Sequence, residues 1–492
     1  MKFSFDLKDF VEKESGADKP AVIGSDSSLT WHEFSERVDA LCADFGRLEL
    51  TGLSQPVIIY GHKRVEMLVA MYACMKLQIT YIPIDVIYPQ ERLQKVLSIS
   101  KSQLIINTTA DKLPFENVAI LHDLAKEKAQ LHNPGIIFEK AVPAADPLIY
   151  IIFTSGSTGE PKGVQISTEA VQSFVRWMTK DFGFTAADVF INTAILSFDL
   201  SVFEVMTFAG LGATLLLTSK EISSVPKSFL QHIHGHQGTV LVATPSFVLA
   251  YARLKDSVEM QGITRYLFCG EVLPHSTAKN LRTSFPNARI INTYGPTEAT
   301  VATTIVEIDD AVLNAFDPLP VGISKPESEL LIEEGEIVIV GPNVSMGYVN
   351  NPELNAAKFV QRNGQRAFKT GDTGSLQNGM LFFNGRNDDL VKLHGYRIEL
   401  NEITAALNNL PYIAHGATIA LKRDGLVKKI VSLVQLLENN TDISIEKMKE
   451  DLAKTLPVYM VPSDIKIIPQ IPLNANGKAD KKLLTEIYLG TN

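Results

Sequence analysis

The chain has few cysteines, no excess of positive charge and no long apolar run, and each shortage excludes a class of protein. Its 492 residues include only 3 cysteines, Cys42, Cys74 and Cys269, which lie far apart and form no CxxC pair. This spacing predicts neither a disulfide framework nor a zinc site. The composition fits a reducing compartment, and we expect a cytoplasmic protein.

Charge and hydropathy narrow the range of partners. With 46 Lys and Arg against 55 Asp and Glu, the formal net charge is −9 at pH 7, which argues against nucleic acid or an anionic membrane surface as a partner. The N-terminus, MKFSFDLKDFVEKESG, carries acids early, and no later run approaches the length of a membrane span. We therefore expect no nucleic acid and no membrane insertion, and small molecules or a specific protein as partners.

Length and pattern predict an α/β protein of more than one domain, because 492 residues are too many for one hydrophobic core. Residues 1–50 are expected to be helical, since apolar residues recur at three- and four-residue spacings in WHEFSERVDALCADF. Apolar strands at 56–60, 80–85, 104–107 and 118–121 then alternate with helical stretches. Such alternation predicts a largely parallel sheet.

The pattern of predicted strands and loops changes in the later part of the chain. Three strand-and-loop units lie between residues 239 and 300, and their loops are expected to converge on one crevice, because ligands of open α/β sheets bind at the carboxyl ends of the strands. Beyond residue 330, EIVIVGPNVSMGY and MLFFNGR predict a β-rich subdomain. A domain-sized piece follows. We place the boundary at Asp388, which gives domains of 1–387 and 388–492.

The segment LIYIIFTSGSTGEPKG, residues 148–163, is the strongest local signal. Its first six residues form an apolar run typical of a buried strand, and the rest is rich in glycines and hydroxyls. Glycines let the backbone approach a polyanion, while the hydroxyls of Thr154 and Ser155 and the charge of Lys162 favour phosphate. It is not a Walker loop, since Pro161 stands where that motif needs glycine. The alternative, a flexible linker, would not normally follow a buried strand.

This loop resembles part of a larger motif set. Taken with NTYGPTEAT (292–300), FKTGD (368–372), NGRNDD (384–389) and NANGKADKK (474–482), it resembles the adenylate-forming superfamily of acyl-CoA synthetases, luciferases and nonribosomal-peptide adenylation domains. The motifs occur in the family's order and span nearly the whole chain. The resemblance implies an α/β fold with a large N-terminal domain of parallel sheets plus a β-rich subdomain, and a small, mobile α+β C-terminal domain.

Within the superfamily, the chain looks most like the branch that ligates D-alanine to a carrier protein. The similar segments are FDLSV (198–202), LFCGEVLP (267–274), NTYGPTEATVA (292–302) and KLHGYR (392–397). This likeness implies that ATP and D-alanine give D-alanyl-adenylate and pyrophosphate. The phosphopantetheine thiol of a D-alanyl carrier protein then takes the alanyl group, at the start of (lipo)teichoic acid D-alanylation. Mg²⁺ is the implied metal, and we expect a monomer.

The resemblance also implies a nucleotide site built from the shared motifs. Tyr294 matches the residue that lies on the adenine ring, Asp372 the acid that binds the ribose hydroxyls, and Glu298 the magnesium-associated acid. The implied nucleotide-binding residues are Thr154, Ser155, Asn292, Thr293, Tyr294, Gly295, Pro296, Thr297, Asp372, Phe383, Asn384, Gly385, Arg386 and Lys478.

Catalysis is expected to depend on positioning and electrostatics, because a substrate carboxylate is already ionised and needs no general base. The resemblance implies Lys478, Thr154, Lys162 and Glu298 as the catalytic residues. In the superfamily the C-terminal domain swings a lysine such as Lys478 onto the α-phosphate and the substrate carboxylate. Asp388 matches the hinge of that movement.

The substrate class is indicated by Asp199, an acid flanked by Phe198 and Leu200. Such an acid is costly to bury unless a cation meets it, and the ammonium of an amino acid would do so. The alternative is an exposed Asp that caps the following helix. Cys269 and Val301 match positions that line the side-chain pocket of the D-alanine enzymes.

Other functions remain open from the sequence. One is a standalone adenylation enzyme for another small amino acid in a peptide pathway; an acyl-CoA synthetase is disfavoured by Asp199, and a non-catalytic relative by the retained charged residues. The alternating His232, His234 and His236 are expected to form a solvated turn at a helix end and not a metal site. Gln78 departs from relatives, which often have glycine there.

Overall fold

The structure is a computed structural model that describes residues 18–25, 27–122, 124, 129–133, 135–140, 146–156, 160–251, 258–386, 390–423, 426–437, 443–473 and 479–490. Contacts within the chain divide it into two compact units. The larger comprises Met1–Val86, Leu97–Phe153 and Gly163–Gly385, and the smaller comprises Ile87–Val96, Thr154–Lys162 and Arg386–Asn492. Asp388 lies outside the described residues, so the domain boundary and the hinge predicted there stay predictions.

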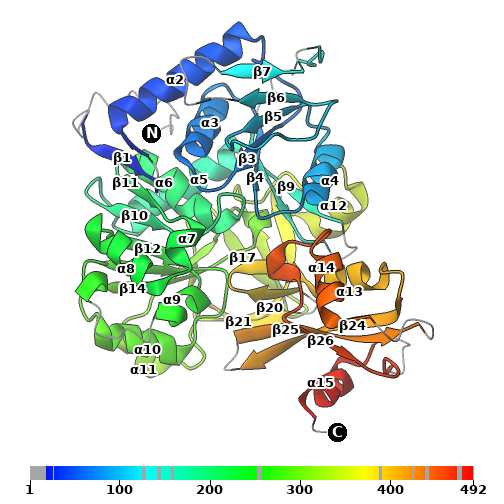
Figure 1. The fold of residues 1–492 in the computed structure, drawn as a ribbon. Helices are drawn as coiled ribbons and strands as arrows, with labels where there is room; N and C mark the ends of the chain where they lie inside the picture. Colours follow the sequence, from blue (N-terminus) through cyan, green and yellow to red (C-terminus); the bar gives the residue numbers. More distant parts are fainter. Residues whose placement is uncertain are drawn as a thin grey trace. The chain divides into compact units, whose positions relative to one another are not determined.

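The first sheet of the larger unit has seven strands in the order β7-β6-β5-β3-β4-β8-β9 (Figure 1). Neighbouring strands among β3, β4, β5, β6 and β8 are parallel, whereas β7 pairs antiparallel with β6. Its strands are β3 (Val57–Gly61), β4 (Tyr81–Asp85), β5 (Leu104–Asn107), β6 (Ala119–His122), β7 (Gln130–His132), β8 (Leu148–Thr154) and β9 (Lys162–Ser167). The predicted strand before the glycine-rich loop is therefore confirmed.

The second sheet has nine strands in the order β16-β15-β14-β13-β12-β10-β11-β1-β2, and its six central strands are parallel. They are β1 (Pro20–Ile23), β2 (Ser28–Thr30), β10 (Val189–Asn192), β11 (Thr214–Leu217), β12 (Val240–Ala243), β13 (Arg265–Phe268), β14 (Arg289–Tyr294), β15 (Thr304–Glu307) and β16 (Ile323–Ser324). The predicted parallel sheet is confirmed. The helix predicted for residues 1–50 is wrong for residues 20–23 and 28–30, which form β1 and β2. Strand β1 pairs with β11, and local periodicity does not reveal such a pairing.

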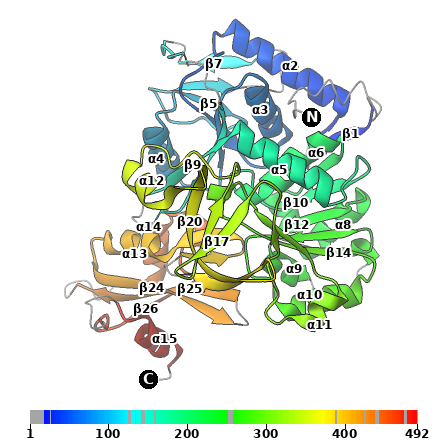
Figure 2. The same cartoon turned by 180° about the vertical axis from the view of Figure 1, so that it is seen from behind.

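Both faces of the nine-stranded sheet are buried, so its strands are apolar without alternation. Phe190 and Leu215 pack into one core and their neighbours Ile191 and Leu216 into another. The first core is shared with α2 (Trp31–Arg47), α3 (Val65–Lys76), α5 (Thr168–Asp181) and α6 (Val202–Leu211); the second with α8 (Pro226–Gly235), α9 (Pro245–Tyr251) and α10 (His275–Ser284) (Figure 2). Further described helices of the larger unit are α7 (Lys220–Ser223), α11 (Asp310–Ala315) and α12 (Pro352–Lys358). Helix α4 (Gln90–Ser100) begins in the smaller unit and ends in the larger one.

Two local features support these helices. A capping box opens α2, because the Thr30 hydroxyl accepts from the Glu33 N–H and the Glu33 carboxylate accepts from the Thr30 N–H. Gln78 follows the end of α3 with φ 55°, a left-handed conformation that glycine adopts most easily. This explains why glycine suits the position in relatives.

The predicted β-rich subdomain is a five-stranded sheet in the larger unit, in which β17, β18, β20 and β19 pair antiparallel and β21 pairs with β20. Its strands are β17 (Glu329–Glu333), β18 (Glu336–Val340), β19 (Phe359–Arg362), β20 (Gln365–Gln377) and β21 (Met380–Arg386). Val338, Val340 and Ala367 form a small core on one of its faces.

The smaller unit is an α+β structure. A two-stranded ribbon, β22 (Leu390–Leu393) and β23 (Tyr396–Glu399), precedes a three-stranded sheet of β24 (Ile413–Arg423), β25 (Leu426–Leu436) and β26 (Asp464–Ile467). Its helices are α13 (Leu400–Asn408), α14 (Ile445–Leu452) and α15 (Lys481–Leu489). Ile403 of α13, Leu452 of α14 and Val434 of β25 share its main core.

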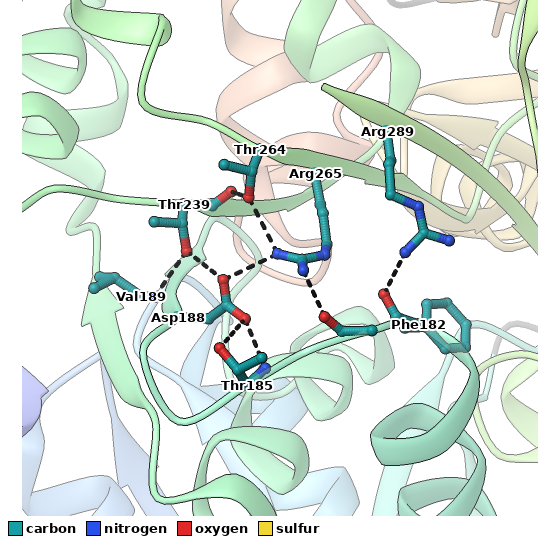
Figure 3. Close-up of polar contacts among 9 residues, drawn as sticks. Phe182, Thr185, Asp188, Val189, Thr239, Thr264, Arg265 and Arg289 are labelled. Atoms are coloured by element: carbon teal, nitrogen blue, oxygen red, sulfur yellow. Dashed lines mark hydrogen bonds and ion pairs between the residues drawn. The ribbon is translucent and has the colours of Figure 1, made fainter. Parts of the chain in front are cut away.

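The amino-terminal ends of the parallel strands are tied by a polar network around Asp188 (Figure 3). One carboxylate oxygen of Asp188 accepts from Arg265 at 3.0 Å and from the Thr239 hydroxyl at 2.9 Å, and the other accepts from the N–H and hydroxyl of Thr185. Arg289 donates to the carbonyl of Phe182 at 2.8 Å. The network fixes the connection between α5 and β10 against the starts of three strands.

Candidate active site

The glycine-rich loop begins where β8 ends. The Thr154 hydroxyl is buried and has no hydrogen-bond partner among the described residues. At Gly156 a Cβ atom would lie 2.0 Å from the carbonyl oxygen of Glu160, so only glycine fits this fold of the backbone. Residues 157–159 of the loop lie outside the described part of the chain.

Residues 397–402 of the smaller unit contact this loop within the same unit. Ser155 donates its hydroxyl to the carbonyl of Arg397 at 2.7 Å, and Gly156 donates its N–H to the Glu402 carboxylate at 3.3 Å. The Lys162 ammonium lies 3.6 Å from the Glu399 carboxylate. The Ser155 hydroxyl and the Lys162 ammonium, both predicted to bind phosphate, thus contact a carbonyl and a carboxylate, and the Gly156 N–H contacts a second carboxylate. These are acceptors of the same kind as phosphate oxygens.

Glu402 is itself held in place by a buried cation. The Arg92 guanidinium lies 2.9 Å from its carboxylate, and the two side chains are 5% and 4% exposed. Burial raises the pKa of Glu402, and the charge of Arg92 opposes that rise. No local sequence pattern connects Arg92 or Glu402 with the loop.

The motif at 292–300 forms the end of β14 and a short 3-10 helix, η3 (Thr297–Ala299). Gly295 must be glycine, because a Cβ atom would lie 2.5 Å from the Cα of Ala302. Asn292 donates to the carbonyl of Pro320 at 2.8 Å, while its Oδ1 atom is buried with no partner among the described residues. The Thr293 hydroxyl donates to the carbonyl of Phe268, which joins this motif to the end of β13.

Residues far along the sequence hold the 3-10 helix. The Tyr348 hydroxyl donates to the fully buried Glu298 carboxylate at 2.7 Å. The Asn343 amide donates to the carbonyl of Ala299 at 3.0 Å, and the Thr300 hydroxyl donates to the carbonyl of Asn343. Asn343 and Tyr348 lie in the predicted segment EIVIVGPNVSMGY, but nothing in its pattern indicated this role.

Cys269 and Val301, the predicted side-chain pocket, lie together. The Cys269 sulfur is 3.8 Å from the carbonyl oxygen of Val301, and both side chains are buried. Thr300 and Val301 have φ values of 55° and 69°, which are rare for β-branched residues. Such strained backbone persists where the surrounding structure fixes it and is concentrated at functional sites.

Tyr294 and Asp372 also meet. The Tyr294 hydroxyl donates to the Asp372 carboxylate at 2.5 Å, and its ring lies 6.0 Å from that of Phe383 between centroids. Asp372 is in the middle of β20 and is 4% exposed. An aromatic face and a buried carboxylate are therefore side by side, as a nucleoside site needs.

Asp199 is the first residue of a 3-10 helix, η1 (Asp199–Ser201), and is 8% exposed. It follows β10, so it lies at the same edge of the sheet as Cys269 after β13 and Tyr294 in β14. Burial and Tyr81 raise the pKa of Tyr150 well above its usual value, and the Asp199 charge adds to this rise. Asp199 is therefore not the exposed helix cap that was the alternative prediction.

The remaining predicted residues are distributed as follows. Phe383, Asn384, Gly385 and Arg386 are the last four residues of β21. The first three belong to the larger unit, and Arg386 begins the last segment of the smaller one. Lys478 and Asp388 lie outside the described residues.

The structure describes no three-carboxylate or histidine cluster that could hold a metal ion. A single buried carboxylate, Glu298, nonetheless fits Mg²⁺, which proteins often bind through one or two carboxylates plus substrate phosphates. The three histidines lie at a helix end, as expected, but His232 and His234 belong to the last turn of α8 itself and only His236 follows it. His232 is not solvated as expected, because it is partly buried and lies 3.2 Å from the carbonyl of Leu217.

Comparison with known proteins identifies the class. Residues 10–349 match the AMP-binding enzyme family, so the chain belongs to that family and is an enzyme of it. The predicted adenylate-forming fold is confirmed by solved structures. The chain superposes on an o-succinylbenzoate CoA synthetase from Bacillus subtilis with a TM-score of 0.82, 20% identity and coverage of 98% and 97% of the two chains. It superposes on the Vibrio cholerae adenylation domain AlmE with a TM-score of 0.82, 22% identity and coverage of 100% and 99%.

The similar curated proteins reported next share one name, unlike the solved structures above. The chain is 37% identical to a D-alanine–D-alanyl carrier protein ligase of Bacillus licheniformis, covering 99% of both proteins. It is 38% identical to a ligase of the same name from Bacillus cereus, covering 96% of this chain and 97% of the relative. No helix in the described part of the chain combines the length and the apolar character that crossing a membrane requires.

Proposed function

We propose that this chain activates D-alanine with ATP to D-alanyl-adenylate and transfers the alanyl group to the phosphopantetheine thiol of a D-alanyl carrier protein. The observation that carries this proposal is the likeness to the B. licheniformis ligase, which extends over 99% of both chains. We further propose that the reaction takes place in the cytoplasm and supplies D-alanine for (lipo)teichoic acid. A monomeric state stays a prediction.

Asp199 would bind the amino group of D-alanine. A buried carboxylate at a sheet edge is costly unless a cation pairs with it, and the substrate ammonium is such a cation. The Cys269–Val301 contact would form the wall that meets the methyl group, and the backbone strain at Val301 would fix that wall. A rigid wall is what a pocket needs to select one chirality of so small a side chain.

In the first step a carboxylate oxygen of D-alanine would attack the α-phosphorus of ATP, and the bond to pyrophosphate would break. The buried Thr154 hydroxyl, which has no partner among the described residues, is available to donate to a phosphate oxygen. Lys162 would exchange Glu399 for phosphate, since both are anionic. Tyr294 would lie on adenine, and Asp372 would accept from the ribose hydroxyls once these replace the Tyr294 hydroxyl.

Mg²⁺ would be held by Glu298 and would neutralise charge on the phosphates. The Tyr348 hydroxyl, which donates to the Glu298 carboxylate, would keep it oriented toward the ion. Lys478, carried by a domain that pivots at Asp388, would contact the α-phosphate and the substrate carboxylate. In the second step the thiolate would attack the alanyl carbonyl and AMP would leave.

The test is to incubate the purified protein with ATP, D-alanine and a phosphopantetheinylated D-alanyl carrier protein, and to weigh the carrier by mass spectrometry. We expect the mass of one alanyl group to be added, and to be removed by hydroxylamine as a thioester requires. Omission of ATP and a carrier with its phosphopantetheine serine replaced are the controls. An unmodified carrier alongside formation of AMP and pyrophosphate would limit the function to adenylation.

A further inference from the structure

Lys63 is a buried lysine that links the two large sheets of the larger unit. It follows β3 with φ 41°, an uncommon conformation for lysine, and is 4% exposed. Its ammonium donates to the carbonyls of Asn192 at 3.1 Å and Thr193 at 2.9 Å, and lies 3.4 Å from the Thr218 hydroxyl. Lys63 follows β3 of the seven-stranded sheet, whereas its acceptors lie at the ends of β10 and β11 of the nine-stranded sheet. Lys63 therefore holds the end of β10 from the neighbouring sheet.

The carbonyls that Lys63 binds begin the loop that leads to Asp199. Asn192 ends β10, and only residues 193–198 separate it from Asp199. The Thr193 hydroxyl donates to the carbonyl of Val242 in β12 at 2.7 Å, and at the far end the Ser201 hydroxyl donates to the carbonyl of Phe198 at 2.8 Å. The loop is therefore tied at both ends, and Lys63 makes two of the bonds at its start.

Two buried acids surround this lysine. Burial lowers the pKa of Lys63 to about 7, and the charges of Glu204 and Asp85 oppose the shift. Asn192 donates its amide to Glu204 at 3.2 Å, so one residue joins the lysine and the acid. The second carboxylate oxygen of Glu204 and Oδ1 of Asn192 are buried and have no partner in the described part of the chain.

Stability alone does not account for this arrangement. Replacing a buried charged network by apolar side chains of similar volume is often neutral or stabilising. Apolar contacts do not fix the direction of a carbonyl group, whereas hydrogen bonds do. The benefit of Lys63 is therefore expected in the geometry of the loop that it holds.

We propose that Lys63 is a positioning residue for the amine subsite, because its hydrogen bonds to the two carbonyls at the end of β10 set the path of the loop that ends at Asp199. The inference rests on the proposed function, since Asp199 receives the substrate ammonium there. Lys63 does not touch the substrate. Its loss should therefore affect the binding of the amino acid much more than that of ATP.

The test is ATP–pyrophosphate exchange by the full chain with Lys63→Met, which keeps the length of the side chain and removes its donors. We expect the KM for D-alanine to rise by about 10-fold to 100-fold, as small displacements of a binding group can cause, and the KM for ATP to change by less than about 2-fold. The matched control is Lys325→Met. Lys325 is 1% exposed and donates to the Ser173 hydroxyl, so its loss should lower the melting temperature without raising the KM for D-alanine.

A second variant keeps the inference testable if Lys63→Met does not fold. Thr193→Val removes the tie from the same loop to Val242 and should raise the KM for D-alanine in the same selective way. An unchanged KM for D-alanine in the folded variants, or an equal rise for Lys325→Met, would overturn the inference. If the unaltered protein exchanges pyrophosphate with no amino acid, the proposed function fails, and the amine subsite fails with it.

Discussion

The two ends of the parallel strands in the nine-stranded sheet carry similar residues with opposite consequences. At the amino-terminal ends, both oxygens of the buried Asp188 carboxylate accept hydrogen bonds from protein donors (Figure 3), and only Arg265 Nε of that cluster lacks a partner among the described residues. At the carboxyl ends, the buried polar atoms without such a partner include Asn192 Oδ1, Glu204 Oε2 and Asn292 Oδ1. Outside the Asp188 cluster, the buried hydroxyl of Tyr266, the second residue of β13, also has no partner among the described residues.

This contrast suggests different roles for the polar groups at the two ends of the strands. Native proteins satisfy almost all buried polar groups, so incomplete ones beside the predicted site need an explanation such as a ligand or ordered water. The strained Thr300 and Val301 lie at the same carboxyl-terminal edge. Polar groups at the amino-terminal edge are therefore expected to contribute stability, and those at the carboxyl-terminal edge to contribute binding.

Among the substitutions that test this difference between the two ends, we expect Asp199→Asn to cause the largest loss of activity. The amide keeps the shape of the carboxylate and removes its charge, so the substrate ammonium would be buried without a counter-charge. We expect a loss of about 3–4 kcal/mol, or roughly 100-fold to 1000-fold in kcat/KM for D-alanine. Pyrophosphate exchange measures this, and a loss below tenfold would contradict the role of Asp199.

The same chemical change at the opposite end, Asp188→Asn, is the matched comparison. Arg265 would lose its buried counter-ion, and we expect the free energy of unfolding in urea to fall by about 3 kcal/mol. The KM values of the protein that remains folded should not change. An altered KM for D-alanine at unchanged stability would contradict the division between the two ends.

The pH dependence of stability tests whether burial lowers the pKa of Lys63, which lies at the carboxyl end of β10. The pKa of Lys63 is about 7 in the folded protein, below the ordinary value of 10.5, while Glu204 from α6 and Asp85 from β4 face it. Between these two values the unfolded chain binds the proton that the folded protein has released. Stability should therefore rise with pH by up to about 1.4 kcal/mol per unit above pH 7, relative to Lys63→Met. Urea unfolding from pH 7 to pH 9 measures this, and parallel curves for the two proteins would contradict it.

The smallest expected effect concerns Tyr348→Phe, which removes the hydroxyl that holds Glu298. One hydrogen bond to a charged group contributes about 1–2 kcal/mol, so kcat/KM for ATP at limiting Mg²⁺ should fall by roughly fivefold to thirtyfold. Tyr266→Phe is the control, because the buried Tyr266 hydroxyl has no partner among the described residues. Equal effects of the two substitutions would remove Tyr348 from the site.

Local patterns in the sequence were sufficient for part of the fold and site. The apolar run at 148–153 predicted β8, because a buried parallel strand is apolar on both faces, and the glycines after it predicted a tight loop. Cys269 and Val301 were predicted as a pair by resemblance, and the structure places them in contact. In contrast, β1 in the region expected to be helical depends on pairing with β11, almost 200 residues away, which no local period encodes.

The residues that hold the site in place were not predictable for the same reason. Tyr348 reaches Glu298 across 50 positions, and Lys63 reaches Thr193 across 130. A single tyrosine or lysine in an apolar stretch has no distinguishing spacing, and its function depends on which strands become neighbours. The contacts of Glu399 and Glu402 with the glycine-rich loop were missed because Glu399 ends β23 just before α13 and Glu402 lies in the first turn of that ordinary amphipathic helix.

The most direct test of the site at the carboxyl ends of the strands is ATP–pyrophosphate exchange by the purified protein with D-alanine, L-alanine, glycine and D-serine at equal concentration. We expect strong exchange with D-alanine and little with the other three, because Asp199 would bind the ammonium and the Cys269–Val301 wall would admit the methyl group in one orientation. Preference for another of these amino acids would keep the adenylation chemistry and contradict the assignment to D-alanine. No exchange with any of them would contradict an amino-acid site at this edge of the sheet.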